Sequence, residues 1–85
     1  MNWEKEARED FEGILSKIPV FLRGIAEKKV SQKAEMLARQ ANRPEVLQKD
    51  VVDAFFMETP FGFHGPMKTD MEALGIDYEK YGHSK

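Results

Sequence analysis

The chain has 85 residues, no cysteine and a formal net charge of −2, with 41% hydrophobic and 33% charged residues. This length predicts one small domain, and the lack of cysteine excludes disulfides, thiolate metal sites and thiol catalysis. No apolar run reaches the length of a membrane span and the first ten residues are acidic, so we expect a cytoplasmic protein with no membrane partner.

The first segment predicts an amphipathic helix over residues 3–15, with Asn2 as its N-cap. Its apolar residues recur at spacings of four, four, three, one and three, which places them on one helical face. They are Trp3, Ala7, Phe11, Ile14, Leu15 and, just after the helix, Ile18. Only a short connection, ending at Pro19, separates this segment from the next, and short connections produce antiparallel neighbours.

The second segment predicts the longest helix, over residues 19–42. Pro19 suits a helix start, and Asn42 tolerates the left-handed conformation that ends helices. The apolar face that we expect to be buried consists of Leu22, Ala26, Val30, Ala34, Leu37 and Ala41, with Phe21, Ile25 and Met36 on its flank. We therefore expect an antiparallel hairpin of helices 3–15 and 19–42, around which the rest of the chain packs.

The second half of the chain completes an all-α domain. A third helix is expected at about residues 48–58, ended by Thr59-Pro60. Residues 60–81 are rich in aromatic residues and in helix-breaking residues, so we interpret them as an ordered strap that lies across the helices. Residues 82–85 are expected to fray.

Three short motifs resemble a known family. They are Trp3-x-x-x-Ala7, Ile18-Pro19-x-Phe21-x-Arg23 and Glu35-x-x-Ala38-Arg39. Together they resemble the PCP reductase domain, a small domain at the C-terminal end of one component of light-independent protochlorophyllide reductase. The similarity covers about residues 3–55. At two places between the motifs this chain is longer than the family pattern by four residues, which fits one added turn on each arm of a hairpin.

The resemblance implies an association with an oxidoreductase of chlorophyll synthesis in photosynthesis. It implies a domain that helps to cover a tetrapyrrole site at a subunit interface, while iron–sulfur clusters held elsewhere supply electrons. This chain has no cluster ligands, so we expect no enzyme activity of its own, no cofactor, and no catalytic or metal-binding residue.

Charge is unevenly distributed along the chain. Residues 19–43 contain six basic and two acidic residues, and acidic residues dominate on both sides. Acidic flanks that neutralise a basic helix are one interpretation, and a basic strip for an anionic partner, including Lys29 and Lys33, is the other. Nucleic acid is not expected as that partner, because the sequence pI is about 5.7.

Four more residues are candidates for binding. For Arg23 we expect a salt bridge to acidic residues between Glu45 and Glu58, with ligand binding as the alternative. His64 is interpreted as a turn histidine, with metal or haem binding as the alternative. Phe61 and Phe63 are expected to cover the core, and they would mark a binding patch if exposed.

These features favour a non-catalytic accessory or binding module. It would dock on a partner enzyme, such as a reductase-type complex, or on a tetrapyrrole-like ligand. The alternative is a structural protein-interaction module, in particular a homodimer along the long helix, with no link to tetrapyrroles.

Overall fold

The computed structural model describes residues 1–85 and has an all-α architecture, which confirms the predicted fold class. Its helices are α1 (Lys5–Ser16), α2 (Val20–Gln40), α3 (Gln48–Glu58) and α4 (His64–Ala73), with short 3-10 helices η1 (Phe61–Phe63) and η2 (Tyr78–Tyr81). Two strands of two residues each, β1 (Asn2–Trp3) and β2 (Glu45–Val46), form a small parallel pair. No helix is both long enough and apolar enough to cross a membrane.

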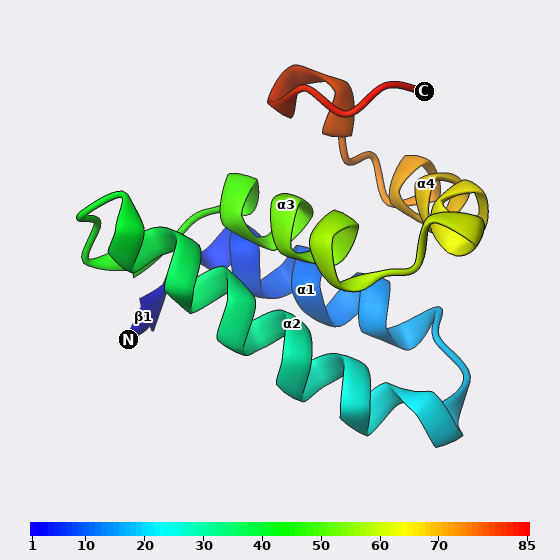
Figure 1. Ribbon diagram of the computed structural model, residues 1–85, viewed down its shortest axis with the longest axis horizontal. Coiled ribbons are helices and arrows are strands. Elements are labelled where there is room, and N and C mark those ends of the chain that lie inside the picture. The colour runs from blue at the N-terminus through cyan, green and yellow to red at the C-terminus, as the bar shows by residue number, and fades with distance from the viewer.

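The hairpin of α1 and α2 is antiparallel, and α3 packs against both helices (Figure 1). The centre of the domain is therefore α3 and not the longest helix. Almost every turn of α3 is buried, through Gln48, Asp50, Val51, Val52, Ala54, Phe55 and Phe56. In α2 only Val30, Ala34 and Ala38 are buried, and two of these are alanines that let α3 approach closely.

The expected apolar face of α2 is only partly buried, because α3 is shorter than α2. The 11 residues of α3 cover about 16 Å of helix, whereas the 21 residues of α2 extend over about 32 Å. The first turns of α2 project beyond the end of α3 (Figure 1). Leu22 is consequently exposed and Ala26 is half-buried. At the other end, Leu37 is half-buried, and Ala41 is exposed because it lies beyond the last residue of α2.

The start of the chain differs from the prediction of a helix at residue 3. Trp3 pairs with Val46, and the Glu4 N–H donates to the Val46 carbonyl at 2.9 Å. The Trp3 indole Nε1 donates to Glu35 at 3.0 Å. Because these contacts hold the backbone extended, α1 begins at Lys5, and Asn2 is not its N-cap.

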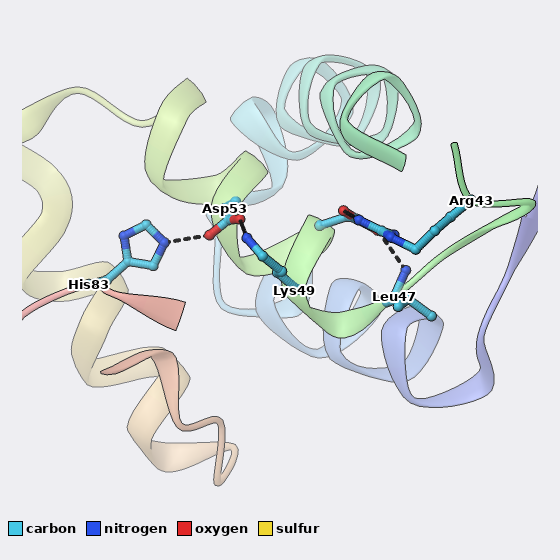
Figure 2. A network of polar contacts seen from close by, with 6 residues as sticks. Arg43, Leu47, Lys49, Asp53 and His83 are labelled. Atoms are coloured by element: carbon cyan, nitrogen blue, oxygen red, sulfur yellow. Dashed lines mark hydrogen bonds and ion pairs between the residues drawn. The ribbon is translucent and has the colours of Figure 1, made fainter. Parts of the chain in front are cut away.

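The end of α2 and the start of α3 are joined by a tight polar network (Figure 2). Asn42 has a φ of 58°, so it adopts the predicted left-handed conformation. Arg43 then contacts Asp50, which is buried in the first turn of α3. The predicted third helix at about 48–58 is confirmed with the bounds Gln48–Glu58.

The expected strap over residues 60–81 contains η1, α4 and η2. Its core-facing residues are Met67, Met71, Ile76 and Tyr78, while the expected core-covering role of Phe61 and Phe63 is wrong, since both are exposed. The Tyr78 hydroxyl donates to Glu72 at 2.5 Å and the Tyr81 hydroxyl to Gln48 at 2.5 Å. In residues 82–85, where we expected fraying, the ring of His83 stacks on Phe56 with centroids 3.9 Å apart.

Candidate binding surfaces

Arg23 stabilises the end of α1 and does not form the predicted salt bridge. Its Nε donates to the Leu15 carbonyl at 2.9 Å, and its Nη2 donates to the carbonyls of Ser16 at 3.3 Å and Ile18 at 2.9 Å. The last carbonyls of a helix have no intrahelical partner, so a guanidinium satisfies them well. The side chain is used structurally, and no acidic residue between Glu45 and Glu58 reaches it.

The two lysine candidates have different surroundings. Lys33 pairs with Glu58 at 3.7 Å, which links the middle of α2 to the end of α3. Lys29 is exposed beside Lys28 and forms no ion pair. Of the expected basic strip, only Lys28 and Lys29 therefore remain accessible at the centre of α2.

The first turns of α2 carry the most unusual surface of the molecule. Val20, Phe21, Leu22 and Ile25 are between 45% and 81% exposed, and we call these four residues the α2 apolar end. The sequence prediction placed Leu22 on the buried face and Phe21 and Ile25 on its flank, which is wrong. Apolar surface of this density on a rigid helix is typical of an interaction site.

A second surface lies around Phe56, where α3, η1, α4 and the C-terminal residues meet. A hollow of about 340 Å³ is lined by Phe56, Phe61, His64, Lys68 and His83, among others. We call it the Phe56 hollow. It brings together two of the residues predicted from the sequence, Phe61 and His64, whereas Arg23, Lys29 and Lys33 lie elsewhere.

Both histidines of the hollow are held in fixed orientations. His64 Nε2 lies 2.9 Å from the Thr59 carbonyl and therefore donates to it, and its ring meets Phe56 edge-on at 5.2 Å. His83 Nε2 lies 2.6 Å from Asp53, and Lys49 contacts the other oxygen of Asp53 at 2.6 Å (Figure 2). Phe61 extends into solvent with 88% of its surface exposed.

Sequence reasoning missed Lys68 and His83 as members of this hollow. Lys68 is one lysine among many in the sequence, and His83 lies in the segment expected to fray. The sequence did contain one signal for this site, the cluster of aromatic residues at Phe55, Phe56, Phe61 and Phe63. Such rings can stack with a nearby histidine.

The buried polar groups have structural partners. No buried side-chain nitrogen or oxygen lacks a hydrogen bond, and no group of three or more histidine, aspartate or glutamate residues is arranged to hold a metal ion. The hydrogen bond to Glu72, together with burial, raises the pKa of Tyr78 to about 12. The surfaces available for binding are therefore the α2 apolar end and the Phe56 hollow.

The protein is a small all-α domain that exposes apolar side chains at the start of α2 and beside Phe56. The chain belongs to the family described as protein of unknown function DUF2621, whose model matches residues 1–84. No curated protein and no solved structure matches it. The resemblance to the protochlorophyllide reductase domain stays a prediction.

Proposed function

We propose that this protein is a non-catalytic binding module of the cytoplasm that docks on a partner protein through the α2 apolar end. The observation that carries the proposal is the exposure of Val20, Phe21, Leu22 and Ile25 within two turns of one helix. The centres of protein interfaces are enriched in such aromatic and aliphatic anchors, and each gains free energy when a partner removes it from water.

The charges beside the apolar end indicate the chemistry of the partner. Lys28 lies seven residues after Phe21 and Lys29 four residues after Ile25, so both share the outward face of α2 with them. Glu27 lies seven residues after Val20, at the edge of the apolar end, so the two lysines outnumber the one acidic residue there. Glu35 is engaged by Trp3 and Arg39. The partner should therefore present an apolar pocket flanked by carboxylates, which would pair with the two lysines.

A second copy of the chain fits this surface less well. Because a two-fold interface uses the same surface of both copies, Lys28 and Lys29 of each copy would lie at its rim. Both lysines are exposed, and the pairing would oppose like charges at the rim of the interface. The homodimer is therefore the alternative that the test must distinguish.

The resemblance to the reductase domain indicates a class of partner. Its most specific motif, Ile18-Pro19-x-Phe21-x-Arg23, overlaps the α2 apolar end. A reductase-type complex is the partner that this overlap favours. If a tetrapyrrole-like ligand binds the isolated chain instead, added protochlorophyllide or haem will change its absorbance spectrum on mixing with pure protein.

Site-specific photocrosslinking in the organism that encodes the protein tests the docking surface. A benzophenone amino acid replaces Phe21 in one variant and the exposed Glu12 of α1 in the control variant. We expect an adduct with a second protein from position 21 alone, lost when Ile25→Asp is added. Adducts formed only with the chain itself or with lipid, or equal adducts from both positions, would overturn the proposal.

A further inference from the structure

The Phe56 hollow has a charge opposite to that of the chain as a whole. The protein has a formal net charge of −2, yet the charged residue that lines the hollow is Lys68, and no aspartate or glutamate lines it. Asp53, which contacts His83, does not line the hollow and is also paired with Lys49 (Figure 2). The local field in the hollow therefore favours an anion.

Lys68 is the one charged donor available to such an anion. It is half-buried, it forms no ion pair, and its ammonium lies 6.0 Å from the centroid of the Phe56 ring. The two histidines do not compete with it for a ligand through Nε2, because Thr59 and Asp53 occupy that atom in His64 and His83.

The walls of the hollow are flat and aromatic. His83 covers Phe56 in parallel, with an interplanar angle of 1°, and His64 meets it edge-on. Phe61 lies 5.5 Å from His64 and leaves most of its ring in solvent. An exposed ring beside a cation offers a stacking surface for a flat group and a charge for an acid on the same ligand.

We propose that the Phe56 hollow binds a small carboxylate that carries a flat aromatic group. Lys68 pairs with the carboxylate, and Phe61 contacts the ring. A volume of about 340 Å³ is enough for a compact molecule, since ligand pockets begin at roughly 300 Å³. Because Gly82, His83 and Ser84 form one wall, the ligand also holds the C-terminal residues against α3.

Amide NMR titrations of the full chain test this site with three probes. Phenylacetate carries both features, phenylacetamide keeps the ring without the charge, and acetate keeps the charge without the ring. We expect saturable shifts at Phe56, Lys68 and His83 with phenylacetate, at least tenfold weaker binding of phenylacetamide, and no saturation with acetate. The α2 apolar end is not part of this site, so the Ile25→Asp variant should bind phenylacetate unchanged.

A pair of matched lysine variants completes the experiment. Lys68→Gln should weaken phenylacetate binding at least fivefold. Lys80→Gln should not, although Lys80 also lies over a ring, 5.2 Å from the centroid of Tyr81, because it does not line the hollow. The unperturbed part of each spectrum reports that the variant is folded. Equal binding of phenylacetate and phenylacetamide, or equal affinity in Lys68→Gln and wild type, would overturn the proposal.

Discussion

Arg43 holds Asp50 through both terminal nitrogens of its guanidinium, with one of the two contacts at 2.7 Å. The same carboxylate accepts the backbone N–H of Leu47 at 2.9 Å (Figure 2). Only 2% of Asp50 is exposed, whereas Arg43 and Leu47 are half-buried. Asp50, in the first turn of α3, thus holds Arg43, which lies three residues after the end of α2. The hydrogen bond from Arg43 to Asp50 raises the pKa of Arg43.

Removing Asp50 should destabilise the connection between α2 and α3. Asp50→Ala removes the hydrogen bonds from Arg43 and the acceptor of the Leu47 N–H, and losing hydrogen bonds to a charged group costs about 1.5–3 kcal/mol. Urea unfolding measures the loss. Glu9→Ala, at an exposed position of α1, should change the free energy of unfolding by less than about 0.5 kcal/mol. Similar values for the two variants would contradict the role of Asp50.

Arg23 should matter for the end of α1. Arg23→Gln removes hydrogen bonds from a charged donor to three backbone carbonyls, so we expect a loss of about 1.5–3 kcal/mol in urea unfolding. Arg39→Gln is the matched control, because Arg39 is mostly exposed and forms only a surface pair with Glu35. If Arg23→Gln and Arg39→Gln lower the free energy of unfolding equally, hydrogen bonds from water replace those of Arg23 without loss.

Gly13 of α1 packs against Leu74, and its replacement by alanine tests how tight this contact is. A Cβ at this position would lie 3.3 Å from both methyl groups of Leu74, which is close but involves the end of a flexible, exposed side chain. Alanine in a helix interior is favoured over glycine by about 1 kcal/mol. Gly13→Ala should therefore raise the midpoint of thermal unfolding slightly. A lowered midpoint would mean that Leu74 is fixed in place.

Tyr78 should make stability depend on alkaline pH. Its pKa is about 12 in the folded protein, above the ordinary value of 10.0, chiefly because it donates a hydrogen bond to Glu72. Between these values the unfolded chain loses the tyrosine proton while the folded protein keeps it, so this contribution to stability falls as the pH rises from 10 to 12. Tyr78→Phe should show a smaller decline over that range.

The pKa itself can be measured directly. The chain has two tyrosines, so Tyr81→Phe leaves Tyr78 as the only phenol. Absorbance of the phenolate near 295 nm should then rise with a midpoint well above pH 10. A midpoint at the ordinary value would show that the hydrogen bond to Glu72 does not form in solution.

Helical periodicity predicted the main elements, because three helices bury residues at spacings of three and four. The residue type of Asn42 correctly predicted the left-handed conformation after α2, because few non-glycine residues tolerate its φ of 58°. Periodicity failed at Asn2–Trp3, where a strand of two residues has no period to detect. It failed again at Phe21 and Ile25, because a pattern in α2 does not reveal that α3 is too short to cover them.

The candidate surfaces were only half predictable for a similar reason. Phe61 and His64 were identified by residue type, in a segment whose composition already suggested a special role. Lys68 and His83 become partners of the same hollow only after the chain turns back at Gly75, which has a φ of 75°. No local sequence pattern predicts that the chain after Gly75 packs beside α3 and α4.

The pairing of β1 with β2 has a consequence for the order of folding. Helices α2 and α3 are neighbours along the chain and can meet early, whereas Trp3 must find Glu35, 32 residues away, and then Val46. Contacts that close long loops form late, because the chain loses entropy before it gains them. The N-terminal residues should therefore be the last to dock and the first to detach. In native-state hydrogen exchange, the Glu4 amide should open at a lower free energy than the amides of α3.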